Sequence, residues 1–128
     1  MTETTHLQAA EQYVLRKLRS RYGVEFRSEH VRLSTGGFHV FDAVASDQSV
    51  VAVIRSASGR TANGQDSAAQ ITDCVAELYY LSLVEAARRL LVLTSPEFHA
   101  LFGKVMRGKV APGITVTHLP LPAAVRAP

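Results

Sequence analysis

The stretch FHVFDAVASDQSVVAVIRSASG, residues 38–59, decides the expected fold of this chain. Residues 38–45 and 50–55 are rich in β-branched and other apolar side chains, which favours two strands. The polar residues 46–49 between them predict a connecting turn. Residues 50–55 are apolar on both faces, as is typical of a central strand that is covered by helices on both sides.

The residues before this hairpin predict a helix and a further strand. Apolar side chains recur at three- and four-residue intervals over residues 7–18, which indicates an amphipathic helix, and Gly23 ends it. Residues 24–33 are expected to form a partly solvated edge strand. The glycine pair in residues 34–37 predicts the turn into residue 38, so that the three strands form an antiparallel meander.

The residues after the hairpin alternate between helix and strand. The segments expected in order are a loop at 56–65, a helix at 66–87, a strand at 89–94, a helix from Pro96 to near Gly108 and a strand at 114–119. A strand, a helix and a strand in succession form a right-handed parallel crossover. We therefore expect one α/β domain over residues 1–119, with helices flanking a mixed central sheet, followed by a flexible tail at 120–128.

Composition excludes several classes of protein. The chain has 128 residues, 47% of them hydrophobic and 20% charged, which is typical of a globular domain that needs no disulfide to fold. Its one cysteine, Cys74, is expected in the core. The longest apolar runs, 50–54 and 90–93, are too short to cross a bilayer, and residues 1–11 do not resemble a secretory signal. A cytoplasmic location without membrane contact is expected.

The charge is small but unevenly distributed. The net charge is +3, and basic residues concentrate in residues 1–32 and 88–109, on either side of an acidic middle. The basic residues of these two segments either form a modest DNA-binding surface or are scattered over solvated helix ends. The residues predicted to contact nucleic acid are Arg16, Arg19, Arg60, Lys104 and Arg107.

Asp42 is the most informative single residue because it interrupts an otherwise apolar strand. If the hairpin is symmetric about residues 47 and 48, Asp42 faces Val53 and Arg55 lies on the same face. Two carboxylates and a cation on adjacent strands can hold Mg²⁺ for phosphodiester cleavage. Here Val53 takes the place of the second acid.

The order of elements and the segment at residues 41–59 resemble the PD-(D/E)xK nuclease-like superfamily, which has the restriction-endonuclease-like fold. The resemblance covers about residues 5 to 119 and implies that Asp42 is the acid of the second strand and a metal ligand. The acid-x-lysine triplet falls on Val53-Ile54-Arg55, and the frequent glutamate of the first helix falls on Glu11. In that family the triplet acid binds metal and the lysine orients or activates water. Arginine keeps the charge but does not give up a proton.

Two roles for Asp42 remain open, namely a metal ligand, live or vestigial, and a structural ion pair with Arg55. Glu77 or Asp66 could replace the missing acid, with help from Gln65 or Gln70, although all four are more simply solvated helix residues. The histidines show no metal-ligand spacing. Of Tyr79 and Tyr80, we expect one in the core and the other near its edge.

Three functions remain. The leading hypothesis is a catalytically impaired nuclease-like domain that binds nucleic acid or a protein and needs no cofactor. The first alternative is an active Mg²⁺-dependent DNA endonuclease that uses Asp42, Glu11 and a migrated acid, with Arg55 steadying the transition state. The second is a structural homodimer that assembles through the edge strand 24–33 or the apolar final helix. The sequence leans toward a protein without enzymatic activity.

Overall fold

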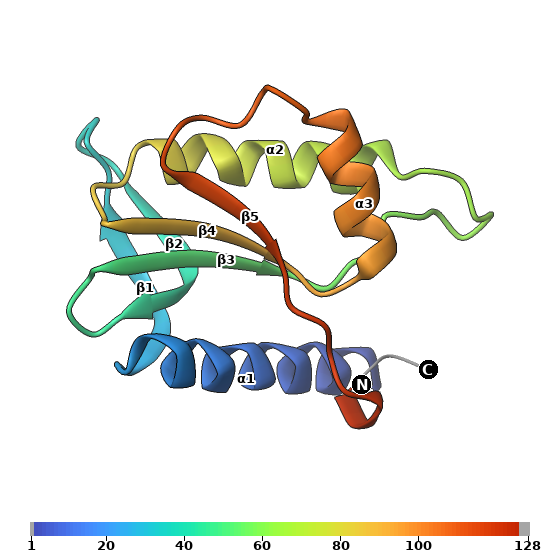
Figure 1. Ribbon diagram of the computed structural model, residues 1–128, viewed down its shortest axis with the longest axis horizontal. Helices are drawn as coiled ribbons and strands as arrows, with labels where there is room; N and C mark the ends of the chain where they lie inside the picture. The colour runs from blue at the N-terminus through green and yellow to red at the C-terminus, as the bar shows by residue number, and fades with distance from the viewer. Residues whose placement is uncertain (1, 126–128) are drawn as a thin grey trace.

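A mixed sheet separates one helix from two others in the computed structural model, which describes the backbone of residues 2–125 and the side chains of residues 8–125 (Figure 1). The elements are α1 (Thr2–Tyr22), β1 (Phe26–Arg32), β2 (Phe38–Ala45), β3 (Val50–Arg55), α2 (Ala68–Ser82), β4 (Arg88–Leu93), α3 (Pro96–Val105), β5 (Ile114–His118) and the 3-10 helix η1 (Ala123–Val125).

The strands lie in the order β1-β2-β3-β4-β5. The first three are antiparallel neighbours, and β3, β4 and β5 run parallel to one another. The predicted meander and the parallel crossover through α2 are thereby confirmed, as is the single mixed α/β sheet. The prediction of an edge position for the first strand is also confirmed.

Two apolar layers hold the helices on the sheet. On one face, α1 buries Ala10, Val14 and Leu18, each at most 2% exposed, against β2, β3 and β4. This i, i+4, i+8 spacing keeps the three side chains on one side of the helix. On the other face, α2 and α3 cover the sheet with side chains that include Leu81, Phe98 and Phe102. Both faces of β3 are buried, as predicted.

Serine side chains set where the two later helices begin. The Ser67 hydroxyl accepts a hydrogen bond from the backbone N–H of Gln70, and Ser95 accepts one from the N–H of Phe98. Each serine satisfies an amide that the first turn of a helix leaves without a partner. Pro96 occupies the first turn of α3, where its missing N–H costs nothing.

The predicted extent of α2 is wrong at its C-terminal end, since the helix stops at Ser82 and not at residue 87. Leu83 caps the helix through its backbone N–H, which bonds to the carbonyl oxygens of Leu81 and Tyr80. The Leu83 carbonyl accepts a hydrogen bond from the N–H of Ser34, and Val84 is buried. Tertiary contacts therefore end this helix without a glycine or proline to mark the stop.

Part of the tail expected to be flexible packs on the domain. Leu121 is 8% exposed in the apolar layer with α1, next to Leu119 from the end of the predicted last strand, and η1 follows. The chain after β5 thus crosses α1 rather than extending away from it (Figure 1). Residues 126–128 lie outside the described residues. Among the described helices, none has the length and apolar content that a membrane span requires.

The loop between β3 and α2 is held against α3 at Gly59. Its φ is +81°, and a Cβ added there would lie 2.8 Å from Cδ1 of the buried Phe98. We expect Gly59→Ala to lower the free energy of unfolding by about 2 to 4 kcal/mol, since it combines left-handed strain with an overpacked core.

Gly64 in the same loop provides the control. Its φ is +78°, but a Cβ there would meet nothing within 4 Å. Gly64→Ala should therefore cost only about 1 to 2 kcal/mol of backbone strain. Equal losses for the two variants in urea denaturation would contradict the tight contact between Gly59 and Phe98.

Candidate functional site

Arg55, the last residue of β3, lies at the centre of the candidate site. Its Nε donates to Asp73 Oδ2 at 2.7 Å, and its Nη1 donates to Asp42 Oδ2 at 3.0 Å and to the Ile54 carbonyl at 3.0 Å. Its Nη2 lies 3.4 Å from Glu77 Oε2. The Arg55 side chain is 26% exposed, so the protein itself takes up most of its hydrogen-bonding capacity.

Asp42 lies where β2 separates from β3. The pairs Ala43–Ala52 and Val44–Val51 confirm the predicted register. The pairing ends there, so Asp42 and Val53, which the same register would set opposite each other, are not themselves paired. Asp42 Oδ2 accepts a hydrogen bond from the Ile54 backbone N–H at 2.8 Å. The carboxylate therefore satisfies a β3 amide beyond the last paired residues, in addition to binding Arg55.

An irregularity in the first hairpin accompanies this separation. Arg27 pairs with Val44, but Glu29 pairs with Phe41, so two β2 residues, Asp42 and Ala43, stand against one residue of β1. Such a bulge bends a strand and re-aims its side chains. Val53 is 1% exposed in the core between the sheet and α2. The position on which the acid of the acid-x-lysine triplet falls is thus occupied by the buried Val53 side chain.

The helix α2 contributes two carboxylates one turn apart. Asp73 and Glu77 lie on the same side of the helix because of their i, i+4 spacing. The Glu77 side chain is 12% exposed, and its Oε1 lies 2.9 Å from His39 Nε2. The His39 ring stacks on Tyr80, with ring centroids 3.8 Å apart. Glu77, a candidate replacement acid, therefore does reach the site.

The local charges favour a cation at Arg55. Burial lowers the pKa of Arg55, but its hydrogen bond to Asp73 and the charges of Asp42, Asp73 and Glu77 outweigh that effect and raise its pKa above the ordinary value. Three carboxylates therefore surround one guanidinium, and the group carries excess negative charge.

Glu11 on α1 is electrically coupled to the same group. Burial raises the pKa of Glu11, and the negative charge of Asp42 raises it further, whereas Arg55 lowers it. Of the three residues predicted to form the catalytic set, Asp42 and Arg55 are therefore in direct contact, whereas Glu11 is coupled to them through charge and forms no ion pair among the described residues.

The carboxylates converge on the guanidinium rather than on a common point. Among the described residues, no group of three or more His, Cys, Asp or Glu side chains is arranged to hold a metal ion. The nearby thiol of Cys74 is buried, as predicted, and burial raises its pKa to about 12, with a further contribution from Asp73. It therefore stays protonated and is not a nucleophile.

The other replacement candidates lie elsewhere. Asp66 forms an ion pair with Arg60 at 3.4 Å in the loop before α2. Gln70 Oε1 accepts a hydrogen bond from the Gly59 N–H, and the backbone of Gln65 bonds to Thr61. These contacts hold the loop before α2 in place. None of the three side chains joins Asp42 as a second metal ligand.

Two members of the cluster, Asp73 and His39, were not predicted. Asp73 immediately precedes the core residue Cys74, and with Glu77 it forms an acidic pair beside the apolar stripe of α2. A parallel crossover places that stripe over the end of β3. The acidic pair beside the stripe was therefore the feature of the sequence that could have indicated Asp73 as a partner of Arg55. No feature of the sequence indicated His39, because its role depends on the stacking of its ring on Tyr80.

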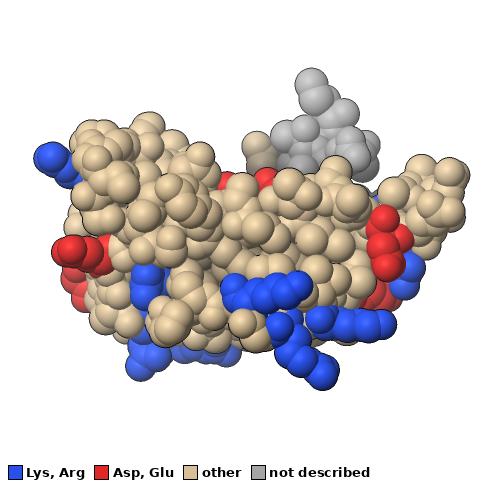
Figure 2. Space-filling model, turned by 90° about the horizontal axis from the view of Figure 1, so that it is seen from above, with Lys and Arg blue, Asp and Glu red and all other residues tan. Residues whose placement is uncertain are grey.

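The five residues predicted to bind nucleic acid do not form one surface. Arg16 and Arg19 lie on α1, on one face of the sheet, whereas Lys104 and Arg107 lie at the end of α3, on the other. Arg19 is paired with Glu25 at 3.0 Å, and Arg60 with Asp66. Seen from the side of α2 and α3, Lys and Arg gather along one edge of the molecule (Figure 2).

Comparisons of this chain with protein-family models, curated proteins and solved structures found no match.

Arg55→Ala tests whether the guanidinium holds the site together. It leaves Asp42 and Glu77, whose side chains are 26% and 12% exposed, without their cation. The free energy of unfolding should therefore fall by about 2 to 3 kcal/mol, somewhat below the cost of breaking a fully buried pair. Urea denaturation at pH 7 measures this loss.

Arg60→Ala is the matched control, because the Arg60–Asp66 pair is exposed on both sides. It should change the free energy of unfolding by less than about 0.5 kcal/mol. Losses of equal size for the two variants would show that the contacts of Arg55 contribute no more than a surface ion pair.

Glu11→Gln tests the electrostatic coupling of α1 to the site. A carboxyl group with a raised pKa in the folded state favours folding when protonated, so stability is lost as pH rises through that pKa. The variant should therefore be more stable than the parent at pH 7, by less than about 1 kcal/mol because Glu11 is exposed. The difference should vanish below the ordinary glutamate pKa of about 4.3.

Thermal unfolding between pH 3.5 and 8 measures this dependence. Glu85→Gln is the control, since Glu85 is exposed and has no ion pair among the described residues. A Glu11→Gln variant that is less stable than the parent at pH 7 would contradict the coupling.

Proposed function

We propose that this chain is a non-hydrolytic, nuclease-like module that binds nucleic acid. The proposal includes the restriction-endonuclease-like fold, for which the support is the order of elements, α-β-β-β-α-β, and the mixed sheet in which β3 is central. The single observation that carries the loss of hydrolysis is the engagement of Arg55 by Asp42, Asp73 and Glu77 beside a buried Val53.

Hydrolysis by this type of site requires a divalent cation between carboxylates and a group that orients water. Here the Arg55 guanidinium supplies one positive charge among the three carboxylates, and Val53 offers no ligand. Arg55 also donates to protein oxygens, so it has little capacity left for a phosphate or for the charge of a transition state.

Basic residues away from this site support nucleic acid as the partner. Arg16, Lys104 and Arg107 are exposed and have no ion pair among the described residues. With a net charge of +3 and a pI near 9.4, the chain would attract a polyanion in a salt-dependent way. The carboxylate-rich group around Arg55 would instead repel phosphate, so binding should use another part of the surface.

Two assays on one preparation test the proposal. Gel-shift titration with single-stranded and duplex DNA at 50 to 300 mM salt should show binding that weakens steeply as salt rises. Plasmid and single-stranded DNA incubated with Mg²⁺ or Mn²⁺ should remain uncleaved, and Asp42→Ala should change neither result beyond its effect on folding.

Two results would overturn the proposal. Metal-dependent cleavage that Asp42→Ala abolishes would establish the active endonuclease instead. Absence of any DNA binding at 50 mM salt, together with a dimer in size-exclusion chromatography, would favour assembly. The open edge of β1 and the exposed Phe38 and Val40 beside it would be the surface for such a dimer, because α3 buries Phe98 and Phe102 in its own core.

A further inference from the structure

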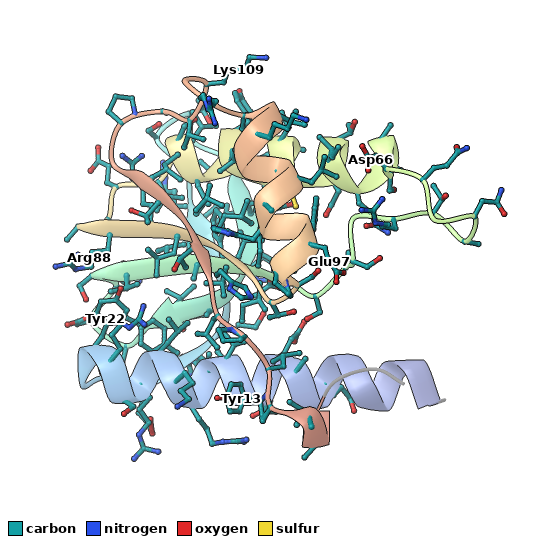
Figure 3. All side chains as sticks on the ribbon, turned by 45° about the vertical axis from the view of Figure 1, so that its right-hand side comes forward. Tyr13, Tyr22, Asp66, Arg88, Glu97 and Lys109 are labelled. Carbon is teal, nitrogen blue, oxygen red and sulfur yellow. The ribbon has the colours of Figure 1, made fainter. Side chains whose placement is uncertain are left out.

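A groove of 420 Å³ lies between α1 and the chain that leaves β5, away from the Arg55 group. Its floor comes from α1 and its wall from the residues at the end of β5. The lining residues are Tyr13, Lys17, Ser20, Arg21, His118, Leu119 and Pro120. Figure 3 shows Tyr13 on α1 beside the segment that follows β5. The volume falls in the range of about 300 to 1,000 Å³ that is usual for small-ligand sites.

The lining is basic and contains no carboxylate. Tyr13, Lys17, Ser20 and Arg21 recur at helical spacing, which places them along one side of α1. Lys17 and Arg21 have no ion pair among the described residues, in contrast to the neighbouring Arg19, which binds Glu25. Two free cations on one face favour an anion such as a phosphate.

Aromatic and apolar groups lie beside these cations. Lys17 Nζ is 5.6 Å from the centre of the Tyr13 ring, so the charge and the aromatic ring belong to one surface. Leu119 and Pro120 provide apolar contact opposite α1. The His118 ring stacks on His99, with centroids 5.5 Å apart.

His118 also has an unmet polar contact. Its Nε2 is enclosed and has no hydrogen-bond partner among the described residues. The ring stacks on His99 of α3 and the atom is enclosed by the protein, so His118 lines the groove without offering Nε2 to a ligand.

We infer that this groove binds an unpaired nucleotide, with the phosphate at Lys17 and Arg21 and the base against Tyr13 and the apolar wall. The inference deepens the proposed function and rests on it. A base within a duplex is stacked on both sides and cannot reach Tyr13, whereas an unpaired base can stack on an aromatic side chain. The nucleotide comes either from a single strand or from a free nucleoside monophosphate.

Fluorescence anisotropy with fluorescein-labelled dT15 tests this site in the full chain. Lys17→Gln/Arg21→Gln should weaken binding at least 10-fold at 50 mM salt. It should also reduce the slope of log K against log salt concentration by about 0.7, since the two cations neutralise one single-strand phosphate. Tyr13→Leu should weaken binding about 5-fold or more without changing that slope, because stacking releases no counterions.

Arg32→Gln/Lys109→Gln is the charge-matched control, because both residues are exposed and outside the groove. It should stay within 2-fold of the parent, and circular dichroism checks that every variant is folded. Unlabelled AMP that displaces dT15 at millimolar concentration identifies the free nucleotide as a ligand. Displacement only by unlabelled dT15 identifies the single strand.

Three results separate the two proposals. If the groove double variant and the control lose affinity equally, the groove is not the site, although nucleic-acid binding stands. Duplex DNA that competes as well as dT15 overturns the requirement for an unpaired base. If the parent binds neither dT15, duplex DNA nor AMP at 50 mM salt, the proposed function and the groove both fail.

Discussion

The guanidinium of Arg55 joins β3 to β2 and α2 through charge. Asp42 approaches it from the bulged strand, and Asp73 and Glu77 approach it from the helix that covers the sheet. Asp42 and Glu77 would be costly to leave largely buried without a cation, and Arg55 offsets that cost for both. The separation of β2 from β3 depends on the same contact, since Asp42 also replaces a strand partner for the Ile54 amide.

The loss of hydrolysis that we propose is compatible with a stable fold around Arg55. A divalent cation and an arginine can both neutralise a cluster of carboxylates, but only the metal activates water. With Val53 packed in the core, a second acid next to Asp42 would have to enter a dry apolar layer. In the proposed non-hydrolytic module, Arg55 therefore stabilises the carboxylates without supplying chemistry, and nucleic acid would bind elsewhere on the surface.

Much of the fold followed from the sequence because apolar periodicity and turn residues are local signals. The bounds of β2 and β3 and the hairpin register were predicted correctly from residues 38–55, where both strands are strongly apolar. The end of α2 was predicted incorrectly, because contacts of Leu83 and Val84 with distant residues set it. The packing of Leu121 on α1 was missed for the same reason. In the site, Asp42, Arg55 and Glu11 were found as candidates, whereas the partners Asp73 and His39 depend on how α2 lies over the sheet.

The central claim is that Arg55 satisfies the carboxylates that would otherwise bind a metal. Backbone amide NMR of the wild-type chain, titrated with Mn²⁺ to millimolar concentration, measures this most directly because the paramagnetic ion broadens nearby signals. Our account predicts that the amides of Asp42, Ile54 and Arg55 broaden no more than those of exposed residues such as Asp47. Selective broadening of those three amides at low Mn²⁺ concentration would show a metal site at Asp42 and would contradict the account.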